Sequence, residues 1–428
     1  MRSLSRRHFL SLTAALPAAL SPRLRTWISA SDDNFLEDLS FRTFLYFWEQ
    51  GDPHTGLVLD RARTNGTQIP GRSLDIASTA LTGFALTAMC IGAERRWLDP
   101  NRLRGRVRAT LQHLAYEQEH VLGWYYHFVN RKTGERAWNS EISTIDTAML
   151  LAGVLTAQQY YRDDGEMFDL ASEIYERVDF NWMLNKRTGL LHMGWLPESG
   201  FLHAEWTAYY EQAVLHMLAI GSPTYPVPAE SWYRFARPEI ESFGYRYVGL
   251  GPLFTHQYSQ AWLDLRNRRD GPPYDIDYFQ NSMAATYAHR AYCLSLRSFA
   301  STYSEYLWGI SASDSDIGYV VWGSPLSRRD VDGTVVPCAV AGSLMFAPRI
   351  CLPALRYMQQ NFGEHIYGHY GFADAFNPQT LWVNPDVIGI NLGITLLSVE
   401  NLRTGRVWDW FNRSNDIQRA MNKVFQVY

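Results

Sequence analysis

The stretch SEISTIDTAMLLAGVLTAQQY, residues 140–160, decides the fold of this chain. It opens with two carboxylates, Glu141 and Asp146, set among serine and threonine, and then becomes apolar around most of its circumference. A helix that is apolar on all sides must be buried on all sides. The stretch therefore predicts a helix that is enclosed by other helices.

The same design recurs along the sequence. An opening with polar or acidic residues near serine or threonine, followed by an apolar run, is found at 73–94, 204–222, 334–348 and 386–402. The segments between these runs, such as 101–118 and 164–178, are amphipathic and charged on one side. This repeat of buried and half-exposed helices predicts an all-α fold, an (α/α)6 barrel of six helical hairpins with few short strands in the loops. The acidic openings of the inner helices would then gather at one rim.

The expected helices follow one another almost to the end of the chain. Periodicity places them at 35–50, 74–95, 101–119, 141–162, 165–184, 204–220, 255–266, 276–301, 337–347, 349–361, 385–402 and 406–424, with a strand near 318–323. Since no Ser/Gly linker or charge block interrupts them, residues 31–428 are predicted to form a single domain.

Residues 1–30 are typical of an export leader. SRRHFLSL (5–12) carries paired arginines before a modest apolar run, and this pattern predicts a twin-arginine signal that the Tat machinery reads, with cleavage after Ala30. The alternative is an N-terminal anchor helix, but the run is too short to span a bilayer and Pro17 breaks it. We therefore expect a periplasmic or secreted protein with no membrane span in its mature form.

Composition narrows the possible partners. The net charge is −4 and no long basic tract occurs, which disfavours nucleic acid and anionic membranes. Aromatic residues make up 14% of the chain, which suits a core and also a cleft that stacks sugar rings. The four cysteines form no C-x-x-C. An oxidising compartment permits a disulfide, with Cys338 and Cys351 as the nearest pair, but buried free thiols are expected. The protein is expected to act as a monomer.

Several familiar sites are excluded by their motifs. The chain has no phosphate-binding loop, no H-E-x-x-H and no G-x-S-x-G. DSDIG (314–318) begins like a calcium loop, but Pro325 stands where the bidentate glutamate is needed. Because the histidines also lack metal-ligand spacing, neither a metal nor an organic cofactor is expected.

Carboxylates with aromatic neighbours remain as the candidate chemistry. Glycoside hydrolysis needs one carboxylic acid to protonate the leaving oxygen and one carboxylate as base or nucleophile. Acids stand at the predicted mouths of the inner helices, namely Asp75, Glu141, Asp146, Glu205, Glu211 and Asp386. Asp75 and Asp386 also have a simpler interpretation, as helix-start residues that the helix dipole favours.

Three acids differ in how well a structural role explains them. Ser143 and Asp146 have the spacing of a capping box, so Asp146 has a structural interpretation beside a catalytic one. Glu141 precedes that cap by two residues, too early for a simple cap. Glu211 is predicted one turn inside a helix among Tyr209 and Tyr210, where burial would raise its pKa as a general acid requires. The alternative for Glu211 is a hydrogen-bonded structural glutamate.

Loops that mix Trp or Tyr with His, Gln and Asn provide the candidate sugar contacts, because rings stack on sugars and polar side chains bond hydroxyls. The substrate-binding candidates are Trp138, Tyr126, His127, Glu205, Tyr210, His256, Gln257, Tyr258, Trp262, Asp314 and Trp322. Aromatic packing between helices is the alternative for any single one of them.

These segments together resemble a known family. Eight segments resemble the glycoamylase-like family, in the same order over 35–412. They are STIDTAMLLAG, GWLPESGFL, YYEQAVLHMLAIGSP, GPLFTHQYSQAW, NSMAATYAHRAYC, WGISASD, DGTVVP and YGFADAFNP. That family includes bacterial β-1,2-glucanases and the C-terminal module of cyclic β-1,2-glucan synthases. The resemblance implies an (α/α)6 barrel, export to the periplasm and action on β-1,2-glucan. It also places Glu141 and Glu211 at acidic cleft positions, with Asp146 beside them.

The sequence thus predicts an exported glycoside hydrolase that cleaves β-1,2-glucan or a related β-glucan, an oligo- or polysaccharide substrate. Glu211 is the predicted general acid, with Glu141 or Asp146 as the base that acts on water. Three alternatives stay open: a transglycosylase acting on periplasmic glucan, a glucan-binding module without activity, and a lyase on uronic-acid polymers. The lyase is disfavoured because the predicted mouths are acidic rather than rich in arginine.

Overall fold

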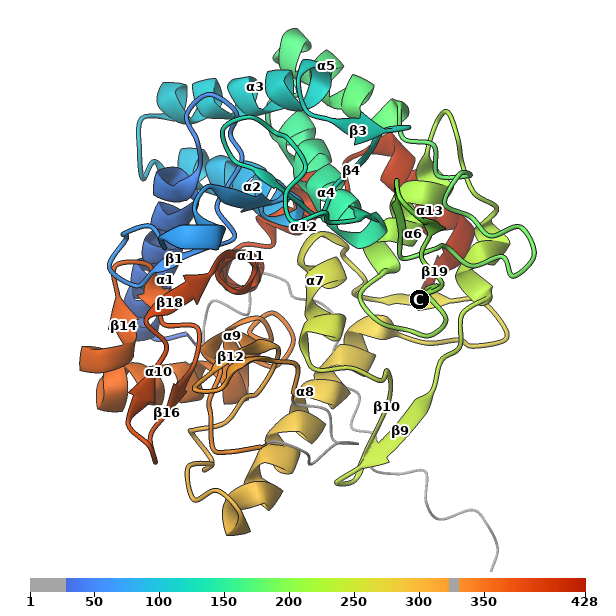
Figure 1. Ribbon diagram of the computed structural model, residues 1–428. Helices are drawn as coiled ribbons and strands as arrows, with labels where there is room; N and C mark the ends of the chain where they lie inside the picture. The colour runs from blue at the N-terminus through green and yellow to red at the C-terminus, as the bar shows by residue number, and fades with distance from the viewer. Residues whose placement is uncertain (1–27, 323–330) are drawn as a thin grey trace, which may run out of the picture.

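Two concentric rings of helices build the molecule (Figure 1). The computed structural model describes residues 28–322 and 331–428, and the statements below concern these residues. The inner ring consists of α2 (Thr79–Arg95), α4 (Thr144–Tyr160), α6 (Ala213–Gly221), α7 (Phe254–Trp262), α9 (Pro337–Ala341) and α11 (Gly389–Arg403). Outside them lie α1 (Ala30–Gln50), α3 (Pro100–Tyr116), α5 (Gly165–Glu176), α8 (Tyr278–Ser295), α10 (Pro348–Ile366) and α13 (Asn415–Val424). The short α12 (Arg406–Phe411) contacts α4, α7 and α11.

The inner helices are buried over nearly their whole length, as their composition predicts. In α4 all but a few residues are buried, and α11 packs against α2, α7 and α9. The closest approach joins α2 to α4 through two glycines. A Cβ atom on Gly83 would lie 2.1 Å from the carbonyl oxygen of Met149, and one on Gly153 would lie 2.1 Å from the carbonyl oxygen of Gly83. The two backbones are therefore in contact, and only glycine fits there.

Short antiparallel strands lead into three of the inner helices. β2 (Ile76–Ser78) precedes α2 and pairs with β5 (Phe128–Asn130). β6 (Ile142–Ser143) precedes α4 and pairs with β7 (Gly194–Leu196), while β18 (Asp386–Ile388) precedes α11 and pairs with β1 (Arg61–Arg63). These pairings fix the backbone at the residues just before each helix, which is where the acidic residues stand.

The remaining strands belong to the loops. They are β3 (His120–Val121), β4 (Trp124–Tyr125), β8 (Gly200–Phe201), β9 (Glu239–Ser242), β10 (Tyr245–Val248), β11 (Arg268–Asp270), β12 (Ser313–Ser315), β13 (Gly318–Val320), β14 (Tyr367–Gly368), β15 (Gly371–Phe372), β16 (Phe376–Asn377), β17 (Trp382–Val383) and β19 (Phe425–Val427). One-turn 3-10 helices occur at Gly71–Ser73, Ala229–Tyr233 and Leu296–Ser298. The expected strand near 318–323 is present as β13.

Several helix boundaries differ from the predicted ones. The predicted helices at 74–95 and 141–162 begin only at Thr79 and Thr144, since the residues before them belong to β2 and β6. The predicted segments 165–184 and 276–301 end at Glu176 and Ser295, and 406–424 is divided into α12 and α13.

The largest difference is in the predicted helix 204–220, which starts only at Ala213. The side chain of Gln212 explains the delay, since its Nε2 donates to the Ala208 carbonyl (2.6 Å) and its Oε1 accepts from the Tyr210 amide (2.8 Å). A side chain that bonds nearby backbone groups in this way competes with helix formation. Glu205 and Glu211 consequently lie in the loop before α6, and the prediction that Glu211 lies inside a helix is wrong.

The described residues also bear on the predictions for the cysteines, a membrane span and the leader. All four cysteines are buried there as free thiols. Within residues 28–322 and 331–428, no helix has the length and apolar character that a membrane crossing requires. Most of the predicted leader, residues 1–27, and position 325 of the calcium-like loop fall outside the described part of the chain.

Candidate active site

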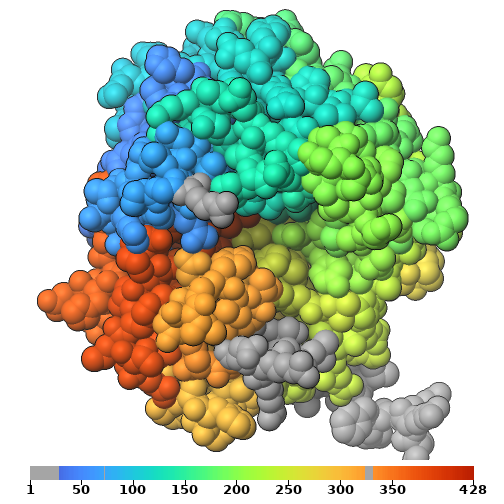
Figure 2. All heavy atoms as spheres, viewed as in Figure 1, coloured from blue at the N-terminus to red at the C-terminus, as the bar shows by residue number. Residues whose placement is uncertain are grey.

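Acidic residues from separate loops meet at one rim of the barrel. Glu141 stands directly before β6, Asp146 lies in the first turn of α4, and Glu211 lies two residues before α6, the inner helix next to α4. The space-filling view shows that this face is hollowed near its middle, between the teal segment around α4 and the orange segment around β12 (Figure 2). Of the acidic openings that the sequence predicts, Glu141, Asp146 and Glu211 lie near one another at this rim.

His127 lies between two of these acids. Its Nδ1 is 3.0 Å from Oε1 of Glu141, and its Nε2 is 3.6 Å from Oδ1 of Asp146. Burial alone would lower the pKa of His127, but the nearby carboxylates of Asp146 and Glu141 outweigh it and raise the pKa to about 9. The imidazole is therefore a cation at neutral pH.

Glu141 is held in its ionised form. The hydrogen bond from His127 lowers the pKa of Glu141, and this effect exceeds the opposing effect of burial. Space for the side chain comes from Gly194 in β7, where a Cβ atom would approach Cγ of Glu141 to 3.1 Å. Glu141 thus has the protonation state that a base or nucleophile needs.

Ser143 caps α4 as its spacing with Asp146 predicts, but the Asp146 carboxylate bonds the Ser143 hydroxyl rather than the backbone. Oγ of Ser143 accepts from the Asp146 amide (3.3 Å) and donates to Oδ2 of Asp146 (2.5 Å). This arrangement caps the N-terminus of α4. The second carboxylate oxygen faces His127, so the cap does not remove Asp146 from the site.

Glu211 has the opposite protonation state to Glu141. Burial raises the pKa of Glu211 to about 8, the charge of Asp146 adds to this rise, and His127 opposes it in part. Ser259 of α7 fixes the segment, because its hydroxyl donates to the Glu211 carbonyl and accepts from the Val214 amide (2.9 Å). At neutral pH the Glu211 carboxyl is therefore protonated, and its pKa is raised as the sequence predicted.

A second acidic group at the inner ring was not found by sequence reasoning. Asp374 is buried, and burial raises its pKa to about 7 although Asn391 Nδ2 donates to its Oδ1 (2.7 Å). The backbone amide of Asp314 donates to Oδ2 of Asp374 (3.1 Å), and Arg61 pairs with the Asp314 carboxylate (2.9 Å). Asp374 follows β15 rather than opening a helix, so periodicity gave no signal for it.

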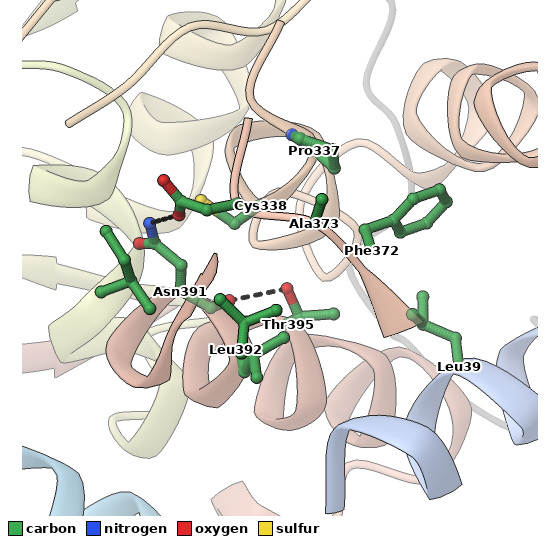
Figure 3. A pocket seen from close by; sticks show the side chains of 11 residues that line it. Leu39, Pro337, Cys338, Phe372, Ala373, Asn391, Leu392 and Thr395 are labelled. Carbon is green, nitrogen blue, oxygen red and sulfur yellow. Dashed lines mark hydrogen bonds between the residues drawn. The ribbon is translucent and has the colours of Figure 1, made fainter. Parts of the chain in front are cut away.

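Asp374 helps to line a small cavity together with Cys338, Asn391 and Thr395 (Figure 3). Its volume of about 10 Å³ is close to the least that holds one water molecule. The cavity is therefore too small for a sugar.

Three of the proposed sugar contacts lie close to the acids, but of these only Trp138 is exposed, since Tyr126 (3%) and Tyr258 (6%) are buried. The side chain of Trp138 is 49% exposed and packs on Phe128 with ring centroids 5.0 Å apart. The hydroxyl of Tyr258 is 3.4 Å from Oδ1 of Asn391, and the charge of Glu211 contributes to the high pKa of that phenol. The guanidinium carbon of Arg136 lies over the Tyr126 ring, 5.0 Å from the centroid of that ring.

Four other candidates lie inside the protein and offer no surface to a substrate. Trp262 is fully buried and donates to Oγ1 of Thr87 (3.0 Å), and Gln257 donates to the Ala339 carbonyl (2.9 Å). Trp322 is 5% exposed and donates to Oγ of Ser313 (3.2 Å). His256 is 2% exposed, and burial lowers its pKa to about 4. For these residues the structure favours the alternative of packing between helices.

The remaining candidates are engaged by neighbours. Asn185 Nδ2 donates to Oε1 of Glu205 (2.5 Å), and Tyr210 is half-buried near Trp206. Asp314 pairs with Arg61, as described above.

Asp75 and Asp386 each pair with basic residues at the rim. Arg131 and Lys132 contact Asp75 at 2.9 and 2.7 Å, and Arg63 contacts Asp386 at 2.7 Å. Neither residue starts a helix, so the helix-start interpretation of both is wrong.

Comparisons with known proteins bear on the fold and the family of this chain. The sequence model of the Glycoamylase family, with the description "Putative glucoamylase", matches residues 203–415, just under half of the chain. A curated relative, the "exo beta-1,2-glucooligosaccharide sophorohydrolase (non-reducing end)" of Parabacteroides distasonis, is 27% identical over 432 residues. The match covers 92% of this chain and 58% of the relative, so the chain spans little more than half of that protein's length.

Solved structures give the same result for the fold. The endo-β-1,2-glucanase of Chitinophaga pinensis, in complex with sophorotriose and glucose, is 24% identical with a TM-score of 0.86, and 93% of this chain and 99% of that chain are covered. The β-1,2-glucanase of Parabacteroides distasonis is 26% identical with a TM-score of 0.84, and 92% of this chain and 60% of that chain are covered. The fold is thus an (α/α)6 barrel, and the resemblance to the glycoamylase-like family is confirmed.

Proposed function

We propose that this glycoamylase-like protein is a glycoside hydrolase that cleaves β-1,2-glucan or a related β-glucan. Glu211 protonates the glycosidic oxygen, and Glu141 or Asp146 accepts a proton from the water that attacks the anomeric carbon. One observation carries the proposal: neighbouring inner-helix mouths hold a protonated carboxyl, Glu211, and an ionised one, Glu141. General acid and general base catalysis need this difference.

The named relatives support the choice of substrate. Two of them act on β-1,2-linked glucose, one as an exo-acting and one as an endo-acting enzyme by name. The aromatic residues beside the acids suit a sugar ring, because an exposed indole such as that of Trp138 offers an apolar face for stacking.

The first test measures product release from linear β-1,2-glucan. We expect wild-type protein to release reducing ends, and Glu211→Gln to lower the rate by roughly 100-fold or more, the usual contribution of a general acid. A Glu211→Gln variant with wild-type activity would remove Glu211 from the mechanism. Transfer without a gain in reducing ends would indicate the transglycosylase, and binding without product would indicate a glucan-binding module.

We also propose that the protein is exported by the twin-arginine pathway to the periplasm or beyond and acts there as a monomer with a single domain. The support is the paired Arg6 and Arg7 before an apolar run. Cleavage after Ala30 would remove Ser29, whose hydroxyl caps α1 by accepting from the Asp32 amide (3.1 Å). Cell fractionation of an Arg6→Lys/Arg7→Lys variant should show precursor retained inside the cell, whereas unchanged export would contradict Tat transport.

A further inference from the structure

We propose that His127 is a positioning residue: a cationic clamp that bridges Glu141 and Asp146 and holds the two carboxylates in place, rather than a group that binds sugar. The inference rests on the proposed function, because it concerns the same site. It adds a residue whose contribution acts through its two partners.

The contacts of the imidazole support this role first. Both ring nitrogens face carboxylate oxygens, Nδ1 towards Glu141 at 3.0 Å and Nε2 towards Asp146 at 3.6 Å. A neutral imidazole carries one N–H, so one of its nitrogens would turn a lone pair towards an anion. Only the imidazolium offers a proton to each carboxylate. The geometry is therefore that of a cation between two anions.

The backbone and the ring of His127 are held in place as well. The His127 amide donates to the Glu141 carbonyl (2.9 Å), and the His127 carbonyl accepts from the Thr79 amide at the start of α2 (3.0 Å). The imidazole stacks on Phe128, with ring centroids 3.9 Å apart and planes 19° apart. The ring thus has one face covered and Nδ1 hydrogen-bonded, while Nε2 faces the Asp146 carboxylate at 3.6 Å.

Charged groups on several elements act on the clamp. Glu141 lies before β6, Asp146 lies on α4, Asp60 lies before β1, and Glu211 lies before α6. The first three raise the pKa of His127, and its positive charge in turn lowers the pKa values of Glu141 and Glu211. Removing the charge at position 127 should therefore raise the pKa values of both Glu141 and Glu211.

The variant His127→Gln tests this consequence through the pH dependence of kcat/KM. We expect both limbs of the profile to move to higher pH, because Glu141 and Glu211 each lose a neighbouring cation, and kcat to fall about tenfold or more. His369→Gln is the matched control, since it removes an imidazole that pairs with Glu49 (2.8 Å) outside the described acidic cluster. In His369→Gln both limbs of the kcat/KM profile should lie at the same pH as in wild type. A higher KM with unmoved limbs in His127→Gln would show a sugar-binding role and overturn the proposal.

A second measurement decides the point without relying on hydrolysis. In NMR spectra of imidazole-labelled protein, His127 is assigned as the signal that His127→Gln lacks. We expect it to be doubly protonated at pH 7.5 and to lose its proton near pH 9, and to do so at lower pH in Glu141→Gln. A neutral His127 at pH 7.5 would overturn the clamp even if the enzyme cleaves glucan. A cationic His127 in a protein without activity would refute the proposed function alone.

Discussion

At the scale of single residues, the site assigns different protonation states to side chains of the same chemical type. Glu141 and Glu211 are both glutamates, yet the first has a lowered pKa because His127 donates to it, and the second has a pKa raised to about 8 because it is buried near Asp146. Sequence reasoning found the raised pKa of Glu211, since tyrosines surround it in the chain. It assigned His127 to sugar binding, because the bridge to Glu141 and Asp146 exists only in space.

The residue-scale prediction concerns the alkaline limb of kcat/KM. Activity should fall above about pH 8, as Glu211 loses the proton that it must donate. Asp146→Asn removes a negative charge that raises the pKa of Glu211, so the residual activity of this variant should decline at lower pH than in wild type. If the alkaline limb of Asp146→Asn lies at the same pH as in wild type, that limb does not report the titration of Glu211.

At the scale of elements, the repeat of buried helices predicted the rings but not where each inner helix begins. Helices α2 and α4 start several residues late because β2 and β6 pair first, and α6 starts nine residues late because Gln212 bonds its own loop. Helix propensity depends on the local sequence and does not predict pairings between distant segments. Asp374 was missed for the same reason, since it is brought to the inner ring by a loop after β15.

The contact between α2 and α4 gives the element-scale prediction. Gly83→Ala should lower the free energy of unfolding by about 1–3 kcal/mol or more, because its Cβ would overlap the Met149 carbonyl and force the helices apart. Gly105→Ala in α3 is the control, since a Cβ there meets open space, and it should raise the same quantity by up to about 1 kcal/mol. Urea titrations of both variants measure these changes. Equal stability of Gly83→Ala and wild type would contradict the close packing.

At the scale of the whole molecule, the closed ring buries histidines between helices, among them His256, which was predicted at the cleft. His256 belongs to α7 and His216 to α6, and burial lowers the pKa of each to about 4. The sequence could not separate such histidines from site residues, because a sugar cleft and a helix interface use the same mixture of ring and amide side chains.

These two histidines predict how stability depends on pH. Their pKa values are lower in the folded state than the usual 6.5, so the unfolded chain binds protons that the folded chain does not. The free energy of unfolding contributed by each group is therefore fully present above about pH 6.5 and is lost as the pH falls towards 4. Denaturation at several pH values should show this decline, and it should be shallower in His216→Phe and His256→Phe. An unchanged slope in both variants would contradict the assignment.

Two leaving groups, compared in Glu211→Gln, test whether Glu211 is the general acid. Nitrophenolate departs without a proton, whereas a sugar alkoxide needs one. On a β-1,2-linked glucan the variant should lose roughly 100-fold or more in kcat, while on the nitrophenyl glycoside of a β-1,2-linked disaccharide it should stay within about tenfold of wild type. Glu141→Gln, as a base variant, should lose activity on both substrates. An equal loss on both substrates in Glu211→Gln would contradict its role as the general acid.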